Sequence, residues 1–499
     1  PSTSANPQFL VKNHPLPITS QQALEIRVIL ALLTALFILV PLCYIPASFV
    51  SFLVKERVSK SKHLQIVSSV SPYLYWTATY CWDCSLFLVL VGFIMIAFFL
   101  FGDAAEVFIH SQESTLALFC LLATYGLSAV PLSYMYSMLF DNFSTAQITI
   151  MVINFMTGFV MVLAYYIMIN VPSTEEEGYA LVHFFRFFPP YNIGEGLINL
   201  GVQYYQNKIN GDNISYFDWH VTGRNIVFML VESVGYFLAV LLTEFPPLLQ
   251  LGHWIQHQRV SRIPSAPPPK HGIDSDVAEE AERVKRIPIG APMQHPGNHH
   301  ETLQEEEGAA LDMVPSVRGH DSLASTTTSS EPACALLIQD LVKTYPPTLL
   351  GGIPKHAVRG VSLACSDGER FGLLGINGAG KTTILGILTG DLQPTSGTVY
   401  IGGKALSDPL TMSMIGYCPQ VDPLLDLMNG YETLWFFGRI RGIPEDILQQ
   451  RVTELIEQVG LQRFAHKPCG TYSGGNKRKL SLAVALVGDP RVLFLDEVS

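Results

Sequence analysis

A glycine-rich loop that ends in a lysine is the most chemically specific feature of the 499-residue sequence. Residues 375–382 read Gly-Ile-Asn-Gly-Ala-Gly-Lys-Thr and match the pattern G-x-x-x-x-G-K-[ST]. In this pattern the backbone N–H groups of the loop and of the following helix surround phosphate oxygens, because glycine leaves room for their approach. Lys381 then reaches the terminal phosphates, and the Thr382 hydroxyl is a ligand for Mg²⁺. The loop is therefore a candidate phosphate-binding site.

Two acidic residues follow an apolar run near the end of the chain. Residues 491–497 read Arg-Val-Leu-Phe-Leu-Asp-Glu, which is typical of a buried parallel strand followed by two carboxylates. Ligands bind such sheets at the carboxyl ends of the strands. In that position Asp496 would hold a metal ion, and Glu497 would polarise or deprotonate a water that attacks the terminal phosphate. Acids also follow buried strands for structural reasons, so this interpretation depends on the glycine loop.

A second anion-binding pattern lies between these two motifs. Ser473, Gly474, Gly475 and Asn476 open a helix that continues as an apolar run. The free N–H groups at a helix amino terminus attract negative charge. We expect this segment to offer hydrogen-bond donors to a terminal phosphate.

The glycine loop needs a strand before it and a helix after it. Residues 371–377 are apolar, as a buried strand would be, and an apolar helical segment follows Lys381. The carboxyl-terminal part of the chain is therefore predicted to be an α/β domain.

The amino-terminal half has the composition of a membrane protein. The chain is 48% hydrophobic and 15% charged, whereas soluble globular proteins carry about 25% charged residues. Apolar runs long enough to cross ~30 Å of hydrocarbon predict an all-α transmembrane domain with five spans. The predicted spans are residues 28–54, 84–102, 115–140, 142–174 and, interrupted by Glu232, 225–243.

The distribution of charge predicts the orientation of these spans. Lys55, Arg57, Lys60 and Lys62 follow the first span, whereas residues 103–113 contain acids but no lysine or arginine. Because basic loops stay in the cytosol, we expect the amino terminus and residues 171–220 outside, and everything after residue 243 in the cytosol. The broken apolar segment 181–201 predicts a re-entrant hairpin on the outer side. The protein would be multi-pass, in the plasma membrane or an intracellular vesicle membrane.

Three features of this half allow more than one interpretation. The basic stretch 55–64 is either an anchor to anionic lipid heads or a docking helix. Glu232 lies within a span, where a carboxylate marks either a functional site or a structural polar contact. Cys81 and Cys84 have the spacing of a metal or redox pair, but no second ligand pair accompanies them. We interpret these cysteines as helix-packing residues.

The two halves are joined by a tract of different composition. Residues 272–332 contain 12 acidic and 4 basic residues, together with proline, serine and threonine runs. Such a tract is predicted to be a mostly disordered linker, in which only residues 276–286 are suited to a short helix. The acidic linker and the net charge of −11 disfavour a nucleic-acid partner.

The order of the motifs resembles that of ATP-binding cassette (ABC) transporters. The glycine loop corresponds to Walker A, Gln420 to the Q loop, residues 473–476 to the signature motif, and Asp496 with Glu497 to Walker B. The chain further resembles the A subfamily, single-chain transporters of phospholipids, sterols and other lipids. Val498 departs from the proline usual in this family. The subfamily likeness rests on residues 472–481, 416–420, 46–65 and 223–225.

This resemblance implies a domain organisation and a set of contacts. Residues 1–22 would end an exocytoplasmic domain, 23–246 form the transmembrane domain, 247–334 the cytosolic linker, and 335–499 an α/β P-loop NTPase domain that is truncated at its carboxyl terminus. ATP and Mg²⁺ would bind, with Lys381, Gln420 and Glu497 as catalytic residues and with Thr382, Gln420 and Asp496 as metal ligands. The implied ATP contacts are Tyr345, which stacks on adenine, and Gly375, Asn377, Gly378, Ala379, Gly380, Lys381, Thr382 and Thr383.

The resemblance also implies partners. In this family ATP lies between the Walker A motif of one nucleotide domain and the signature motif of the other, so Ser473 to Asn476 would serve the opposite site. The basic stretch 55–64 would be the coupling region. We therefore expect the carboxyl-terminal half of a transporter that moves membrane lipids only together with its amino-terminal half and first nucleotide domain. Two alternatives stay open: a non-hydrolysing ATP-binding regulator, and a transporter of a non-lipid amphipathic substrate.

Overall fold

The computed structural model describes residues 20–210, 214–245, 275–287, 334–347 and 353–497. The chain divides into two compact units, one made of residues 1–58 and 71–249 and the other of residues 59–70 and 250–499. Residues 59–70 thus belong to the second unit, although both of their chain neighbours belong to the first. Residues 1–19 of the predicted amino-terminal segment 1–22, and most of the predicted linker, lie outside the described residues.

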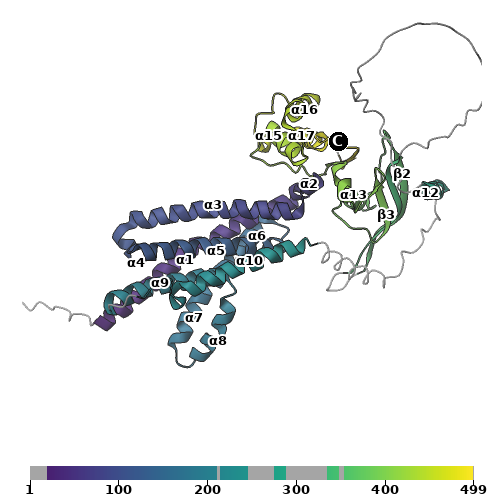
Figure 1. Ribbon diagram of the computed structural model, residues 1–499. Coiled ribbons are helices and arrows are strands. Elements are labelled where there is room, and N and C mark those ends of the chain that lie inside the picture. The colour runs from purple at the N-terminus through teal and green to yellow at the C-terminus, as the bar shows by residue number, and fades with distance from the viewer. Residues whose placement is uncertain (1–19, 211–213, 246–274, 288–333, 348–352, 498–499) are drawn as a thin grey trace, which may run out of the picture. The chain divides into compact units, whose positions relative to one another are not determined.

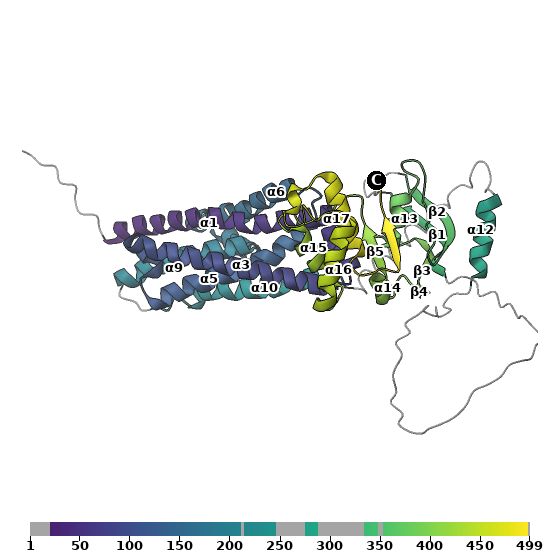
Figure 2. The same ribbon diagram turned by 90° about the horizontal axis from the view of Figure 1, so that it is seen from above.

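The first unit is a bundle of long apolar helices (Figures 1 and 2). Among the described residues, five helical stretches are long and apolar enough to cross a membrane, which confirms the predicted number. They are α1 (Ser20–Val58), α3 (Pro72–Phe101), α5 (Gln112–Ser137), the series α6 (Phe143–Phe155), η2 (Met156–Val160) and α7 (Met161–Asn170), and η3 (Trp219–Gly223) with α10 (Arg224–Thr243).

The second span begins twelve residues earlier than predicted. Helix α3 starts at Pro72, where Ser71 caps the free N–H of Leu74. The charge of Asp83 suggested a boundary, but Asp83 is buried and accepts a 2.5 Å hydrogen bond from the hydroxyl of Tyr134 on α5. Because a buried acid with a good partner is tolerated inside a bundle, Asp83 does not end the helix.

Two helices replace the broken apolar segment 181–201. Helix α8 (Glu175–Phe185) packs against α7, and α9 (Pro189–Asn210) packs against α1, α5 and α10. Two prolines occupy the first positions of α9, where a missing N–H is harmless. The break therefore falls at residues 186–188, and α9 extends beyond the predicted segment. Short η1 (Gly102–Ala105) and α4 (Glu106–Ile109) join α3 to α5.

The core of the bundle is aromatic and aliphatic. Tyr125 of α5 and Tyr191 of α9 are fully buried with Leu39 and Leu121 in one cluster. The Tyr125 hydroxyl donates a 3.1 Å hydrogen bond to the carbonyl of Leu42 in α1. Buried hydroxyls need such partners, so this bond helps to fix α5 against α1.

The second unit contains two small sheets. Strands β1 (Cys334–Tyr345), β2 (Lys355–Ser366), β3 (Ser396–Ile401) and β4 (Lys404–Ala405) form an antiparallel sheet in the order β2-β1-β3-β4. Strands β5 (Ile415–Cys418) and β6 (Val492–Leu495) pair in parallel, with Cys418 opposite Leu495. The strand predicted before Asp496 is thereby confirmed as β6.

The strand predicted before the glycine loop is not present as a strand. Residues 371–376 have no regular secondary structure, and Leu374 and Ile376 are 92% and 83% exposed. A strand exists only where its N–H and C=O groups pair with neighbours, and no described strand pairs with this segment. The strand prediction for residues 371–376 was therefore wrong, because an apolar pattern alone does not supply the neighbouring strand.

Helices complete the second unit. Helix α13 (Lys381–Leu388) packs on the β-strands through Ile384 and Ile387. A separate core cluster joins α15 (Gly430–Ile440), α16 (Glu445–Gln458) and α17 (Gly474–Leu486), with Phe437 and Leu480 almost completely buried. Short α14 (Pro409–Ser413) and η4 (Cys469–Thr471) lie between these elements in sequence.

Two further helices belong to the second unit. Helix α2 (Ser61–Val67) comes from the basic stretch between the first two spans. Helix α12 (Ser275–Arg286) is the short helix predicted within the linker, and it lies beside β2 (Figure 1). It packs on β1 and β2 through the fully buried side chain of Val284.

Candidate nucleotide-binding site

The glycine loop has the backbone geometry that phosphate binding requires. Gly378 and Gly380 have φ angles of 85° and 96°, in the left-handed region that favours glycine. A Cβ atom on Gly380 would lie 2.4 Å from the carbonyl oxygen of Ala357 on β2. The loop ends at the amino terminus of α13, whose first residue is Lys381. The free N–H groups of this terminus are therefore available to an anion.

The lysine of the loop lies against the loop itself. Lys381 Nζ donates hydrogen bonds to the carbonyl oxygens of Gly375 at 2.5 Å and Ile376 at 3.2 Å. The side chain of Thr382 is exposed, and that of Thr383 is partly exposed. The predicted phosphate contacts of this segment thus share one short loop and the first turn of α13.

The Q-loop and Walker B residues meet at one sheet edge. Strands β5 and β6 run parallel, so residues that follow both strands lie at the same end. The amide Nε2 of Gln420 donates a 2.6 Å hydrogen bond to Glu497 Oε2. The backbone N–H of Asp496 donates to the carbonyl of Cys418 at 3.0 Å. Two residues that are 77 positions apart in sequence are therefore in direct contact.

The charges around Asp496 connect this edge to the glycine loop. Burial, followed by the negative charge of Glu497, raises the pKa of Asp496, whereas the positive charges of Arg478 and Lys381 lower it. Lys381 is therefore close enough to Asp496 to act on it electrostatically. Like these two positive charges, a bound cation would lower the pKa of Asp496 and so favour its ionised form.

Arg478 is a component of the site that the sequence analysis did not identify. Its side chain is 13% exposed and lies 3.4 Å from the carboxylate of Asp422. Its guanidinium also donates to the carbonyl oxygens of Pro419 and Asp496, and so joins α17 to the residues after β5 and β6. The sequence signal that could have indicated it is the basic run 477–479 at the start of α17.

The signature residues and the adenine-stacking candidate lie elsewhere on the unit. Ser473 caps α17 by accepting a hydrogen bond from the Asn476 N–H at 3.3 Å, and Gly474 and Gly475 are exposed. Tyr345 ends β1, with Lys343 Nζ 5.4 Å from its ring centroid. In the described part of the chain, no hydrogen bond joins these residues to residues 375–383. The structure thus brings Gln420 and Glu497 together, but not the signature and the glycine loop.

The predicted metal ligands, at this edge and in the first turn of α13, are of types suitable for Mg²⁺. Thr382 offers a hydroxyl oxygen, Asp496 a carboxylate, and Gln420 an amide oxygen, since its Nε2 is used by Glu497. Magnesium prefers oxygen ligands and usually combines one or two protein groups with phosphates and waters. The donor set therefore fits a Mg²⁺ ion bound together with a nucleotide.

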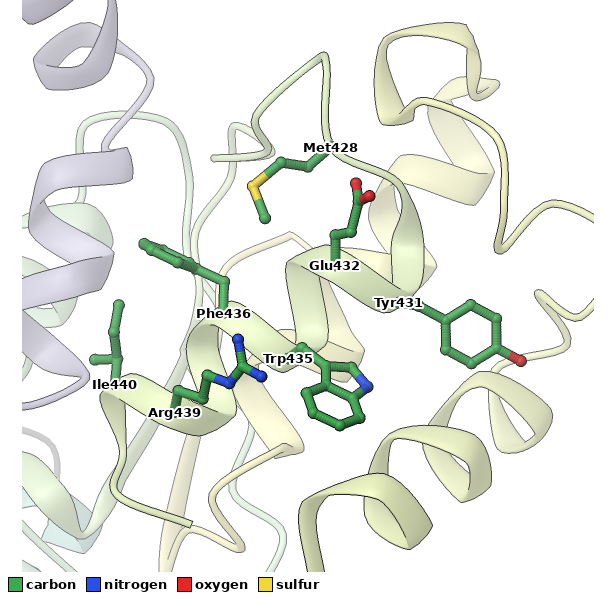
Figure 3. Close-up of a pocket in the computed structure, with 7 residues that line it drawn as sticks. All are labelled: Met428, Tyr431, Glu432, Trp435, Phe436, Arg439 and Ile440. Atoms are coloured by element: carbon green, nitrogen blue, oxygen red, sulfur yellow. The ribbon is translucent and has the colours of Figure 1, made fainter. Parts of the chain in front are cut away.

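A pocket in the helical layer is separate from this site. A cavity of about 730 Å³ runs along α15 and contains none of the glycine-loop residues. Figure 3 shows Trp435 and Arg439 on the same side of the helix, where the guanidinium lies 4.9 Å from the indole ring. Three of the pocket's seven lining residues are aromatic, and it does not contain the phosphate-binding groups described above. Its lining residues are Met428, Tyr431, Glu432, Trp435, Phe436, Arg439 and Ile440.

Helix α2 contacts the elements that carry the site. Lys60 Nζ forms a 2.9 Å ion pair with Asp391, and His63 Nε2 lies 3.3 Å from the Thr389 hydroxyl at the end of α13. Leu64 belongs to the core cluster of α15, α16 and α17. Residues 59–64 of the basic stretch thus belong to the second unit, in agreement with the docking-helix interpretation, whereas residues 55–58 end α1.

The comparisons with known proteins agree with both units. Residues 3–242 match the family model described as ABC-2 family transporter protein, and residues 358–499 match that described as ABC transporter. The fold and the motifs therefore define an ATP-binding cassette transporter chain with a membrane-embedded part.

The related proteins identify the subfamily. The chain is 33% identical to rat ATP-binding cassette sub-family A member 7 over 97% of its length, and 34% identical to human sub-family A member 2 over its full length. It is 32% identical to the human retinal-specific phospholipid-transporting ATPase ABCA4 over 98% of its length. The chain belongs to the A subfamily of ATP-binding cassette transporters. It spans about a fifth of the length of these relatives.

Proposed function

We propose that this chain is the carboxyl-terminal half of an ATP-hydrolysing transporter of membrane lipids. The observation that carries the proposal is the direct contact between Gln420 and Glu497 beside Asp496, at an edge on which Lys381 acts electrostatically. These are the groups needed to position a metal-bound triphosphate and the water that attacks it.

Each residue of the site has a separate role in this proposal. The N–H groups of the loop and Lys381 hold the phosphates, and Glu497 accepts a proton from the attacking water. Gln420 orients Glu497 through its 2.6 Å hydrogen bond. Tyr345 stacks on adenine. When bound by Thr382, Asp496 and Gln420, Mg²⁺ would neutralise charge that develops on the terminal phosphate.

The proposal also explains the position of α2. This helix follows directly from the first membrane span in sequence but packs on the Walker A helix and on the helical layer. A change at the nucleotide site that moves α13 would therefore move α2 and the spans on either side of it in sequence. Because the contacts include an ion pair as well as buried apolar side chains, α2 follows the nucleotide unit as a body.

Lipid is the substrate class that the relatives support. One relative is named as a phospholipid-transporting ATPase, and the likeness covers 98% of this chain, including all five apolar helices. We propose that lipids reach the bundle from the membrane and that the amino terminus and residues 171–220 face outside. The second unit and the linker are then cytosolic, and an amino-terminal half with its own nucleotide domain supplies the opposite ATP site.

The test is a single substitution in the intact transporter. Glu497→Gln should retain ATP binding but lower ATP turnover at least about tenfold, the low end of what general-base catalysis supplies. Turnover is measured in liposomes of defined phospholipid and sterol content, with redistribution of a fluorescent lipid recorded in the same vesicles.

The controls separate the possible functions. Glu457→Gln, at an exposed position of α16, should leave turnover unchanged. Undiminished turnover in Glu497→Gln would remove Glu497 from the catalytic role. ATP binding without hydrolysis or lipid redistribution in the wild type would instead favour a regulatory protein, and stimulation only by non-lipid amphiphiles would overturn the lipid assignment.

A further inference from the structure

Unpartnered polar atoms concentrate at the contact between α9 and α10. In the described part of the chain, eight buried side-chain nitrogen or oxygen atoms have no hydrogen-bond partner, and five of them belong to residues of these two helices. Buried polar atoms normally have partners, so each exception requires an explanation. The five residues are Tyr191, Asn192, Arg224, Asn225 and Glu232.

Two carboxyl groups lie at this contact, and their surroundings are opposite. Glu195 of α9 is 2% exposed and accepts hydrogen bonds from Arg186 at 3.1 Å, Arg224 at 3.0 Å and Asn225 at 2.7 Å. Two guanidinium groups thus compensate its charge. Such a buried carboxylate is stable as an ion.

Glu232 of α10 has no comparable compensation. It is 8% exposed, and the side-chain amide of Asn192 donates to its Oε1 at 2.9 Å. Its Oε2 is buried without a partner, and no described lysine, arginine or histidine forms an ion pair with it. An ionised carboxylate with a single neutral donor is expensive inside a membrane bundle.

The hydrogen bonds of Asn192 show that a donor is missing at this contact. Its Nδ2 donates to Glu232 Oε1 and also, at 2.8 Å, to the carbonyl oxygen of Arg186, so both of its N–H donors are used. This pair of acceptors fixes the orientation of the amide, because the reversed amide would direct its oxygen at two other oxygens. Asn192 Oδ1 is then buried without a donor.

A single proton on Glu232 gives a hydrogen bond to both unpartnered atoms, Glu232 Oε2 and Asn192 Oδ1. Asn192 Oδ1 and an ionised Glu232 Oε2 are both acceptors and cannot bond to each other. A protonated Oε2 is a donor, and with the existing bond it completes a two-bond pair between a carboxylic acid and an amide. The nearby donors among the described residues are bonded to other acceptors and do not reach Glu232 Oε2. Arg186 and Arg224 bind Glu195, and the Tyr236 hydroxyl donates to the carbonyl oxygen of Phe187.

Among the described residues, no charged side chain on the other helices packed around α10 pairs with Glu232, and Asp83 of α3 accepts its hydrogen bond from Tyr134 of α5. On α3, Tyr80 shares a hydrogen bond with Ser233, and α5 contributes Tyr136 near Tyr236; both side chains are neutral phenols. The single acidic residue of α5, Glu113, lies in its first turn and accepts hydrogen bonds from Ser215 and Tyr216.

We propose that Glu232 and Asn192 form a proton-binding site that joins α9 to α10. Glu232 carries the proton on Oε2 and donates it to Asn192 Oδ1. When the proton leaves to water, the O–H bond breaks, its electrons stay on the carboxylate, and two acceptors face each other across the contact. Deprotonation therefore loosens α9 from α10. The site does not depend on the nucleotide chemistry or on the transported substrate.

Infrared spectroscopy of the intact transporter in lipid nanodiscs tests the protonation state directly. The wild type should show the carbonyl band of a protonated carboxylic acid, which shifts in D₂O and disappears at alkaline pH. The band should be lost in Glu232→Gln and retained in Glu195→Gln. In Asn192→Leu it should move to higher frequency, because the acid loses its hydrogen-bonded partner. Absence of the band in the wild type, or its persistence in Glu232→Gln, would overturn the proposal.

Hydrogen exchange of α9 tests the structural consequence with a matched pair of variants. Glu232→Gln offers Asn192 the same donor and acceptor as the protonated acid, so α9 should exchange within about twofold of the wild type and lose its pH dependence. Glu195→Gln removes the charge that two arginines require, so α9 should exchange at least about tenfold faster. Equal loss of protection in both variants would contradict a proton on Glu232.

Discussion

Gly380 and Glu497 hold backbone conformations that few residues adopt, and both lie at the proposed nucleotide site. Gly380 has a φ angle of 96°, and Glu497, which carries a side chain, has a φ angle of 48°. A left-handed conformation costs a residue with a Cβ about 1–2 kcal/mol. Such strain is concentrated at functional sites, where the surrounding structure maintains it. Glu497 is held by Gln420 and by the parallel pairing of β6.

Two glycines of the loop should respond differently to substitution by alanine. At Gly378 a Cβ would meet no atom within 4 Å, so Gly378→Ala adds only the cost of the positive φ angle. At Gly380 the Cβ would also lie 2.4 Å from the Ala357 carbonyl. Gly380→Ala should therefore weaken ATP binding at least about tenfold, or ~1.4 kcal/mol, and more than Gly378→Ala. Titration with a fluorescent ATP analogue measures both affinities, and equal effects would contradict the steric argument.

At the scale of elements, two short helices decide how the nucleotide unit is connected to the rest of the chain. Helix α2 packs on the nucleotide unit through Leu64, Val67 and the ion pair of Lys60 with Asp391. Helix α12 covers β2, where Glu280 accepts from the Ala364 N–H at 3.2 Å and Arg283 donates to the Ala364 carbonyl at 3.2 Å. These side chains satisfy strand groups that would otherwise invite another strand.

The α2 contact should weaken in acid because of His63. Burial lowers the pKa of His63 and outweighs the opposing effect of Asp391, whose carboxylate lies 3.8 Å away. A histidine whose folded pKa is below its unfolded value of about 6.5 contributes stability above that pH, and this contribution is lost as the pH falls further. Hydrogen exchange of residues 61–67 should therefore accelerate on acidification more in the wild type than in His63→Gln.

His466 provides the control for this experiment, because its side chain is exposed. In His466→Gln, hydrogen exchange of residues 61–67 should accelerate on acidification as much as it does in the wild type. If His63→Gln also shows the wild-type acceleration, protonation of His63 is not the cause.

The packing of α12 can be tested with two valines of the same helix. Val284 is completely buried against Leu337 and Ala364, whereas Val277 is 56% exposed. Val284→Asp places a charge in an apolar contact and should release the helix, while Val277→Asp should not. The amide of Ala364 should then exchange at least about tenfold faster in Val284→Asp, because it loses the Glu280 acceptor. Unchanged exchange would show that α12 does not protect the edge of β2.

At the scale of the whole molecule, the chain corresponds to one part of the architecture of its relatives. The likeness extends over 97–100% of this chain but over only about a fifth of the length of each relative. Within the described residues no hydrogen bond joins Ser473 to the glycine loop, and Ser473 caps its own helix. This arrangement agrees with an ATP site shared between two nucleotide domains, as the family resemblance predicts.

A substitution in the signature should therefore act on the opposite site. Gly474 begins α17 and has open space around its Cβ position, and an acid is favourable in the first turn of a helix. Gly474→Asp should fold normally and bind ATP at Lys381, yet lower trapping of nucleotide by the first nucleotide domain at least about tenfold, because it repels the terminal phosphate. Trapped nucleotide is measured in each half after limited proteolysis.

Thr453→Asp on the exposed face of α16 controls for added charge. Trapping lost at the Lys381 site instead would place the signature in the same site as its own Walker A motif.

The residue pattern alone determined the two-part organisation, the five spans, the glycine loop and the strand before Asp496. These depend on composition and local spacing, which periodicity and motif chemistry express directly. Sequence also predicted α12 within the linker, because helix propensity is local.

Tertiary structure decided the features that depend on partners distant in sequence. The apolar run 371–376 is not a strand, because a strand requires neighbours to pair with. Asp83 does not end a span because Tyr134 binds it, and Arg478 enters the site because α17 brings it to the ends of β5 and β6. Glu232 was recognised as unusual from sequence, but only its pairing with Asn192 indicates a protonated acid, since the burial and hydrogen bonds that set its charge come from another helix.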